Sequence, residues 1–367
     1  MISIERVSIS GFKSFSRLQD IELRALNVII GANGAGKSNF IQLLRLVKAL
    51  AQGEFQTFIM KHGEADSFLH HGPKTTPRLE VSLQFTGPDD SSPCYSFSLE
   101  PDADQRFLLT ERLGARLTAP LPAPSRESQL LTSVSESPDA LASVLGQAIR
   151  HWEFYHFHDT SPTAGMRRSE IVDDHLRLRP CAENLASFLL HLRHRHPQHY
   201  RQILWTIQTV IPFLEDFDLT VYQAGEAEKV KLTWFQKHGN HYPMQPYQLS
   251  DGSMRFICLA TALLQPKLPS AIIIDEPELG LHPEAIEVLA GLLKTAATHT
   301  QVLVATQSPQ LLDALSVEDI VVARRDHGSS TLQRLSPEDL NSWLEEYSLG
   351  ELWRKNVIQG GGTSHEP

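Results

Sequence analysis

Two short segments contain the residue types that phosphate chemistry requires. The first, Gly31–Ser38, holds three glycines and ends in Lys37 and Ser38, directly after the apolar run Val28–Ile30. Glycines let successive backbone N–H groups face an anion, and the start of a following helix adds a partial positive charge. We therefore predict a phosphate-binding loop in which Lys37 contacts the outer phosphates and Ser38 binds Mg²⁺. The predicted nucleotide-binding residues are Asn33, Gly34, Ala35, Gly36, Lys37, Ser38 and Asn39.

The second segment places two carboxylates, Asp275 and Glu276, at the end of the apolar run Ile272–Ile274. Ligands of open α/β sheets bind at this end of the strands. Acidic residues before a proline, here Pro277, are also common at helix starts, so a simple helix cap is the alternative when the segment is taken alone. Together with the upstream loop, the segment predicts Asp275 as a ligand of Mg²⁺ and Glu276 as the base that polarises the attacking water.

Two further segments contribute to the predicted site. Ser250 and Gly252 precede an amphipathic helix, so they either cap that helix or present its N–H groups to a phosphate. Gln307 follows the apolar run Val302–Ala305. Its amide can hydrogen-bond a phosphate oxygen or the attacking water, but it cannot carry a proton. Gln307 is therefore the third candidate catalytic residue, with a plain loop glutamine as the alternative.

Buried strands must carry these loops. Four continuously apolar runs are typical of strands in a parallel sheet that is covered on both faces. A helical apolar pattern extends from Phe40 to Leu50, directly after the glycine-rich loop. The chain therefore predicts an α/β fold with a sheet whose loops converge on one edge. The four runs are Val28–Ile30, Ala271–Ile274, Val302–Ala305 and Ile320–Ala323.

Alternating patterns predict antiparallel strands elsewhere in the chain. Residues 1–15 and 152–157 are each expected to form a strand, and residues 183–213 to form two helices broken near Pro197. Gly, Pro and Ser clusters predict loops. The expected hairpins pair 79–85 with 95–99 around a turn at 87–90, and 217–222 with 229–235, and the expected loops cover 53–77 and 118–138.

The composition excludes several classes of protein. The 367 residues carry a formal net charge of −10, which argues against a protein that coats nucleic acid with its whole surface. The cysteines Cys94, Cys181 and Cys258 have no paired spacing, so we expect neither a zinc site nor disulfides. Because disulfides are rare in the reducing cytoplasm, we expect a cytoplasmic location. No apolar run is long enough for a membrane helix. One basic segment, residues 193–201, follows several arginines and is either a solvated helix face or a contact for nucleic acid or a partner.

The four motifs together resemble the ABC, RecF and SMC-like group of P-loop ATPases. The segments Ile9–Phe15 and Gly280–Pro283 add to this likeness. More narrowly, the chain resembles compact bacterial AAA-type, RecF-like ATPases in its segments 157–161, 275–283 and 347–353. The resemblance covers nearly the whole chain apart from the Pro- and Ser-rich insertion. It implies a P-loop NTPase fold of ABC/RecF type, with a mixed central sheet, an antiparallel β subdomain and an inserted helical lobe.

The resemblance also implies how the chain is divided and assembled. A homodimer would form head to head around two ATP molecules and Mg²⁺, with Ser250 and Gly252 completing the partner's site. A histidine that senses the γ-phosphate usually stands where this chain has Gln307. The equivalent of the family's first-lobe glutamine stays open between Gln84 and His158. The expected division is a first ATPase lobe at 1–158 with an insertion at about 116–140, a helical and hairpin lobe at 159–249, a second ATPase lobe at 250–355, and a flexible tail at 356–367.

The sequence is compatible with three functions. The leading hypothesis is an ATP-hydrolysing head that gates a separately encoded, nuclease-like effector associated with DNA, in genome maintenance or antiphage defence. The second is a nucleotide-dependent switch or scaffold that hydrolyses ATP slowly, because Gln307 replaces the usual histidine. A transporter motor subunit is the third and the least favoured. The residues do not distinguish ATP from GTP, because none of them specifies the base.

Overall fold

A central six-stranded sheet carries the predicted phosphate loop, the acidic pair and Gln307. The computed structural model describes residues 2–87, 92–104, 106–114, 119–120, 124–130 and 140–358. The strand order is β17-β16-β3-β15-β14-β8, with β17 antiparallel to β16 and the other neighbours parallel. The predicted mixed α/β sheet is therefore confirmed. Its strands are β3 (Leu26–Ile30), β8 (Trp152–Tyr155), β14 (Ala271–Asp275), β15 (Gln301–Thr306), β16 (Ile320–Asp326) and β17 (Ser329–Arg334).

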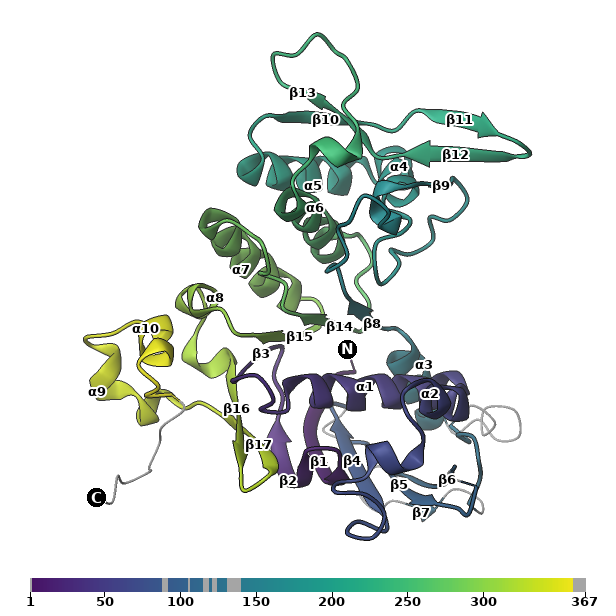
Figure 1. The fold of residues 1–367 in the computed structure, drawn as a ribbon, viewed down its shortest axis with the longest axis vertical. Helices are drawn as coiled ribbons and strands as arrows, with labels where there is room; N and C mark the ends of the chain where they lie inside the picture. Colours follow the sequence, from purple (N-terminus) through teal and green to yellow (C-terminus); the bar gives the residue numbers. More distant parts are fainter. Residues whose placement is uncertain are drawn as a thin grey trace.

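A second six-stranded sheet, entirely antiparallel, lies below the central one (Figure 1). The predicted hairpin of 79–85 and 95–99 is present, with Val81 opposite Phe97. The predicted strand over 1–15 is instead two strands, because Lys13 adopts a left-handed conformation with φ 46° at the turn. Its strands are β1 (Ile4–Phe12), β2 (Phe15–Glu22), β4 (Leu79–Phe85), β5 (Cys94–Pro101), β6 (Phe107–Gly114) and β7 (Ala119–Pro120).

Helix α1 (Lys37–Gln52) fills the space between the two sheets. Its apolar residues share one core with alternate residues of the central strands, such as Ile29 and Ile273, and with the inner face of the outer sheet. The other central-sheet residues, such as Val28 and Ile272, face a second core. Because both faces are covered, the strands are apolar throughout, as the sequence predicted.

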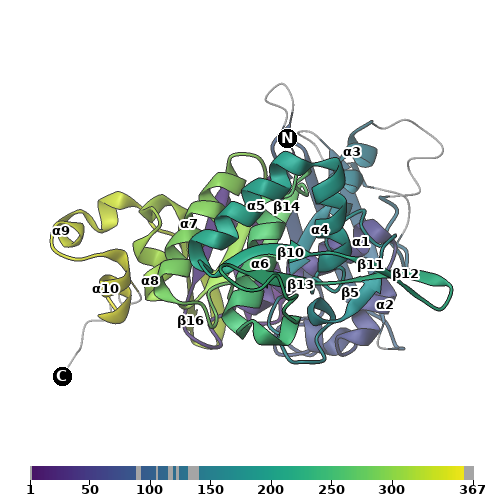
Figure 2. The same ribbon diagram turned by 90° about the horizontal axis from the view of Figure 1, so that it is seen from above.

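The second core joins the central sheet to helices from the second half of the chain. These include α6 (Asp251–Leu264), α7 (Pro283–Ala297) and α8 (Pro309–Asp313), and beyond them α9 (Asn341–Leu344) and α10 (Leu349–Arg354). Above α6 in Figure 1, α4 (Leu185–Arg195) and α5 (Pro197–Val210) meet at Pro197, as predicted. Both views show these helices next to the strands formed by residues 214–236 of the same lobe (Figures 1 and 2).

The second predicted hairpin is present with the predicted antiparallel pairing, in which Phe217 lies opposite Trp234 and Tyr222 lies opposite Lys229. The pairing is interrupted after Asp218 and before Thr233, so each arm of the hairpin is divided between two small sheets. One sheet pairs β10 (Leu214–Asp218) with β13 (Thr233–Gln236), and the other pairs β12 (Ala227–Lys231) with both β11 (Val221–Ala224) and β9 (Ser169–Ile171). The pairing of β9 with β12 was not predicted, because periodicity does not report which distant strands become neighbours.

Segments predicted as loops contain helical turns and defined hydrogen bonds. Residues 53–77 contain α2 (Phe55–Lys61) and a 3₁₀ turn at Ala65–Phe68, because Phe55 and Phe68 are buried against Phe107. Glu127, within the predicted insertion, accepts hydrogen bonds from the first N–H groups of α2 at 3.0 Å. Helix α3 (Ala140–Arg150) follows, while the predicted turn residues 88–90 and residues 131–139 lie outside the described residues.

The first residues of the predicted flexible tail are packed against the fold. Of residues 356–367, the structure describes 356–358, and Ile358 there is buried. The Ile358 carbonyl accepts a 2.7 Å hydrogen bond from the Arg324 guanidinium. Packing therefore extends to Ile358, and residues 359–367 lie outside the described part of the chain.

Candidate nucleotide-binding and hydrolysis site

The glycine-rich loop connects β3 to α1 and leaves the start of that helix free to bind an anion. Gly34 and Gly36 have φ angles of 77° and 114°, which glycine adopts without strain. No side chain caps α1, so its first N–H groups keep their hydrogen-bonding capacity. A Cβ added at Gly36 would lie 2.6 Å from the Ser330 hydroxyl oxygen, so the loop is also packed from behind. This arrangement suits the close approach of phosphate oxygens.

Lys37 is buried within the loop that it belongs to. Its ammonium group donates hydrogen bonds to the carbonyls of Gly31 at 2.6 Å and Ala32 at 3.3 Å. Burial lowers the pKa of Lys37, and the nearby carboxylates, led by Glu276, oppose that shift. The loop therefore holds a positive charge beside the acidic end of β14. Asn39, by contrast, donates to the Ser14 hydroxyl at 2.8 Å, so it braces the loop against the β1–β2 turn.

The acidic pair lies at the carboxyl end of β14. Burial, followed by repulsion from Glu276, raises the pKa of Asp275, while His158 and Lys37 oppose the shift. Glu276 adopts a left-handed conformation with φ 43°, which costs a non-glycine residue about 1–2 kcal/mol. A 2.8 Å hydrogen bond from the Glu276 N–H to the Ala305 carbonyl holds this conformation. The strained backbone turns the Glu276 side chain away from the direction of the strand.

Gln307 joins three loops that are far apart in the sequence. Its amide nitrogen donates to the Glu276 carboxylate at 2.7 Å and to the Asn33 side-chain oxygen at 2.9 Å. The loops after β3, β14 and β15 therefore meet through one side chain, as expected for neighbouring parallel strands. The arrangement brings the predicted base, the predicted sensor and the phosphate loop into direct contact.

Glu278 is a site residue that the sequence prediction missed. One of its carboxylate oxygens accepts hydrogen bonds from the Thr306 hydroxyl at 2.5 Å and from the Gln307 N–H at 3.4 Å. The other oxygen is buried and has no protein partner among the described residues. Burial raises the pKa of Glu278. Its position two residues after Glu276 was the available signal, but only the fold shows that it holds the Gln307 backbone.

The residues predicted to complete a partner's site lie at the start of α6. The Ser250 hydroxyl accepts a 3.1 Å hydrogen bond from the Ser253 N–H, so Ser250 does cap the helix. A Cβ at Gly252 would lie 2.3 Å from the Gly280 carbonyl oxygen, so only glycine permits this contact between the two loops. Leu279 beside it is 47% exposed, and Tyr247 just before Ser250 is 67% exposed. These exposed apolar residues surround the start of α6.

Two buried arginines shape this region. Arg167 donates to the Leu249 carbonyl at 3.2 Å and to the Asp251 carboxylate at 2.9 Å. Arg255 donates to the carbonyl of Phe157 at 2.9 Å and also to that of Leu279. Arg167 therefore does not belong to an exposed basic face with its neighbours in the sequence, because it supports the backbone before α6.

The structure separates the two candidates for the first-lobe glutamine. His158 follows β8 and donates from Nε2 to the Asp275 carbonyl at 2.9 Å. Gln84 lies on β4 in the outer sheet, where its amide is 3.5 Å from the Glu5 carboxylate. His158 is therefore the candidate that lies at the same sheet edge as the acidic pair.

The residues present suit a magnesium nucleotide. Ser38 is exposed in the first turn of α1, and Asp275 offers a carboxylate near Lys37. Both are oxygen donors, as Mg²⁺ requires, and bound Mg²⁺ would neutralise charge on the phosphate oxygens. No cluster of three His, Cys, Asp or Glu side chains among the described residues could hold a metal. Ser38 and Asp275 would therefore be the protein ligands, with phosphate and water oxygens as the others.

The fold and the site define a P-loop ATPase of the ABC and SMC-head type. A family model described as "AAA domain, putative AbiEii toxin, Type IV TA system" matches residues 26–313. Because this match covers most of the sequence, the chain belongs to that family. Proteins of this class bind ATP with Mg²⁺ and hydrolyse it.

Solved structures share this fold at low sequence identity. A crystal structure of the SmcHead bound to the C-winged helix domain of ScpA is 18% identical, with a TM-score of 0.61 over 92% of this chain and 99% of that one. An Smc head domain with an extended coiled coil, bound to the C-terminal domain of ScpA derived from Pyrococcus furiosus, is 15% identical, with a TM-score of 0.54 over 94% and 99%. These likenesses confirm the predicted fold class.

A curated relative is similar over a shorter segment. The energy-coupling factor transporter ATP-binding protein EcfA2 of Staphylococcus aureus (strain MRSA252) is 25% identical over 114 residues. The match spans 31% of this chain and 38% of the relative, so the chain covers well under half of that protein. Within the described part of the present chain, no helix is both long enough and apolar enough to cross a membrane.

Replacing Gln307 by alanine is expected to lower ATP turnover by about 10²-fold, the effect of losing one hydrogen-bond donor from a reaction site. The side chain orients Glu276 and links it to Asn33, and alanine removes both hydrogen bonds. Steady-state phosphate release measures the effect. Gln310→Ala, an exposed glutamine on α8, is the matched control. Unchanged turnover in Gln307→Ala would assign Gln307 to the loop structure alone.

Proposed function

We propose that this chain is an ATP-hydrolysing head that closes in pairs around ATP and Mg²⁺ and gates a separately encoded effector that acts on DNA. The Gln307 amide carries this proposal, because it joins the phosphate loop to Glu276. A bound triphosphate would contact Asn33 and Lys37, and Gln307 would transmit that contact to the base. Lys37, Gln307 and Glu276 would then act together on the γ-phosphate and its attacking water.

Head-to-head closure is supported by the surface around α6. Ser250 and Asp251 at the start of α6 are exposed. Leu279 and Tyr247 nearby expose apolar area that a partner would cover. Ser250 and Gly252 would then face the γ-phosphate bound by the partner. The two SmcHead structures contain a domain of a second protein, ScpA, which is consistent with a head that acts through another polypeptide.

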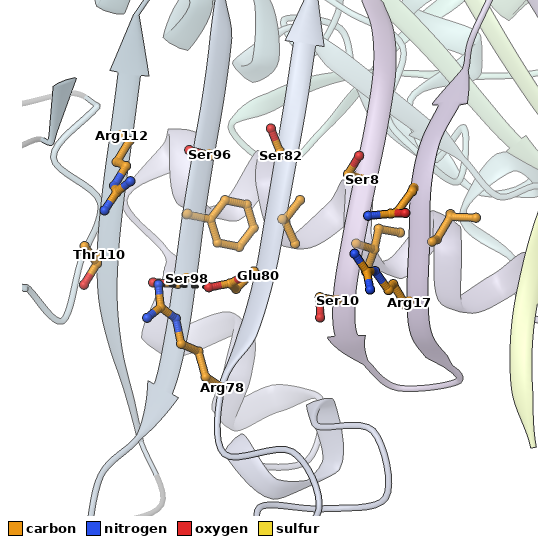
Figure 3. Close-up of a pocket in the computed structure, with 15 residues that line it drawn as sticks. Ser8, Ser10, Arg17, Arg78, Glu80, Ser82, Ser96, Ser98, Thr110 and Arg112 are labelled. Carbon is orange, nitrogen blue, oxygen red and sulfur yellow. Dashed lines mark ion pairs between the residues drawn. The ribbon is translucent and has the colours of Figure 1, made fainter. Parts of the chain in front are cut away.

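The DNA part of the proposal is supported by the open face of the outer sheet. A hollow of about 690 Å³ there is lined by six Ser and Thr side chains and by Arg17, Arg78 and Arg112 (Figure 3). Arg78 pairs with Glu80 at 3.0 Å, whereas Arg17 and Arg112 have no ion pair among the described residues. Arginine and hydroxyl groups are typical contacts of a sugar–phosphate backbone.

The double variant Arg17→Ala/Arg112→Ala is expected to weaken binding of double-stranded DNA and to reduce its salt dependence. Each lost phosphate contact should lower the slope of log K against log salt by about 0.9. Fluorescence anisotropy at several salt concentrations measures the slope. The matched control is Arg24→Ala/Arg354→Ala, because both residues lie outside this hollow. A slope identical to that of the wild type would remove this face from the DNA proposal.

The whole proposal is tested by ATP turnover with and without double-stranded DNA, together with the mass of the protein by light scattering. A mass that doubles with ATP, and turnover that DNA raises, are the expected results. Turnover that is insensitive to DNA at low salt, with and without the product of a neighbouring gene, would contradict the DNA part. We place the protein in the cytoplasm, in genome maintenance or antiphage defence, and the family description of a putative toxin supports defence over transport.

A second candidate function is a switch or scaffold that scarcely hydrolyses ATP. The observation that favours it is the 2.7 Å hydrogen bond from Gln307 to Glu276, which occupies a carboxylate oxygen of the base. The neutral amide also cannot take up a proton. Wild-type turnover well above that of Glu276→Gln would exclude this candidate.

A further inference from the structure

A small basic pocket lies in the upper lobe, built from elements other than the nucleotide site. It has a volume of about 220 Å³ and lies between α4, the start of α5, the end of α6 and the loop before α4. Figures 1 and 2 show where α4, α5 and α6 lie in this lobe. None of its lining residues is a carboxylate, although the chain has a net charge of −10. Its basic and polar lining residues are His175, Arg177, His191, His196, Lys267 and Gln265.

The histidines of the pocket contact one another. The rings of His175 and His191 are stacked with centroids 4.5 Å apart, and His196 lies 5.9 Å from His191. The Nδ1–H of His175 donates to the Val172 carbonyl at 3.0 Å, so its Nε2 is the nitrogen left to contact a ligand. The described histidines do not form a three-residue metal site. Once stacked imidazoles are protonated they repel one another, and a bound anion would balance their positive charge.

The carboxylates near the pocket form ion pairs. Asp174 forms a 2.8 Å ion pair with Arg179, and Glu153 pairs with Lys48 at 3.2 Å. Glu153 also forms a 3.4 Å ion pair with Arg177, which is largely exposed. Lys267, the other cation that lines the pocket, has no ion pair among the described residues.

The surroundings of His191 favour its neutral form until an anion binds. Burial, and then the neighbours His175 and His196, lower the pKa of His191, with Arg195 and His194 of its own helix adding to the shift. On α5, His199 lies 6.2 Å from His196 and extends the cluster. A bound anion would reverse the repulsion and draw protons onto the rings. Anion binding should therefore strengthen as the pH falls through the histidine range.

We propose that this pocket binds a phosphate group, as a dianion held by Lys267, Arg177 and the protonated histidines. The size of the pocket suits one phosphate group, and the donors are those that contact phosphate elsewhere. The group could belong to a free phosphorylated molecule or to the 5′ end of a nucleic acid. The proposal does not depend on ATP hydrolysis, because no residue of the pocket belongs to the nucleotide site.

Sulfate binding to the full chain tests the proposal, because sulfate keeps its double charge between about pH 6 and pH 8. Calorimetry should show binding about tenfold tighter at the lower pH, the effect of raising one histidine pKa by one unit. His191→Gln and Lys267→Ala should each weaken it by about tenfold at the lower pH and leave the thermal midpoint nearly unchanged. His299→Gln and Lys294→Ala are the matched controls, since neither lines the pocket.

The phosphate loop can also bind sulfate, so the Lys37→Ala variant separates the two sites. Sulfate binding that persists in Lys37→Ala and is lost in Lys267→Ala supports the pocket. Binding that is independent of pH, or intact in both pocket variants, overturns the proposal. Sulfate binding that is lost in Lys37→Ala but kept in the pocket variants also overturns the proposal.

Competition against sulfate identifies the source of the phosphate. Displacement by inorganic phosphate but not by DNA supports a free ligand. Displacement by 5′-phosphorylated but not 5′-hydroxyl DNA supports a nucleic-acid end. Equal displacement by both DNAs would indicate backbone binding and contradict a site for a terminal phosphate group.

Discussion

Glu276→Gln is expected to lower ATP turnover by about 10²–10⁴-fold and to hold the protein as an ATP-bound dimer. The expected factor is the usual contribution of a general base. Glutamine keeps the size of the side chain, and its amide oxygen can still accept the 2.7 Å hydrogen bond from Gln307. Phosphate contacts made by the loop and by Lys37 should therefore survive, while activation of the water is lost.

The measurement combines steady-state phosphate release with light scattering in ATP and Mg²⁺. A doubled mass in Glu276→Gln that falls when ATP is removed is the expected outcome. Glu287→Gln, an exposed glutamate on α7, is the matched control and should turn over ATP like the wild type. A monomeric mass for Glu276→Gln at saturating ATP would contradict head-to-head closure, and unaltered turnover would contradict the role of Glu276 as the base.

Lys37→Ala is expected to raise the dissociation constant for ATP by roughly 10- to 150-fold, the effect of losing a hydrogen bond to a charged group. The ammonium group lies in the loop, 2.6 Å from the Gly31 carbonyl, where it faces the carboxylates of Asp275 and Glu276. Alanine removes the attraction for the phosphates and leaves those carboxylates to repel them. Both effects weaken the binding of ATP.

Displacement of a fluorescent nucleotide gives the dissociation constant, and thermal unfolding gives an independent check. ATP that binds the folded state raises its unfolding free energy by RT ln(1 + [ATP]/Kd), so the variant should lose this rise. The midpoint without ATP tests whether Lys37→Ala still folds. Lys74→Ala, which changes an exposed lysine of a loop, is the matched control. ATP affinity equal to that of the wild type would remove Lys37 from the binding site.

The sequence by itself determined the parts of this protein that depend on neighbouring residues. A strand, a glycine-rich turn and a helix follow one another at Leu26–Gln52, so residue types and spacing were sufficient to predict the loop. The continuously apolar runs before Glu276 and Gln307 likewise predicted buried parallel strands, because covered strands are apolar on both faces. The α/β fold class followed from these local patterns and from the family resemblance.

Only the tertiary structure decided which distant residues meet. Asn33, Glu276 and Gln307 come together because β3, β15 and β14 are neighbours in the sheet, and His158 joins them because β8 pairs with β14. The same dependence explains the pairing of β9 with β12, which the sequence did not predict. It also explains why Arg167, one of the arginines that precede the basic segment in the sequence, is buried. Its side chain supports the backbone just before α6. Periodicity reports which face of an element is buried, whereas the order of strands is set by long-range packing.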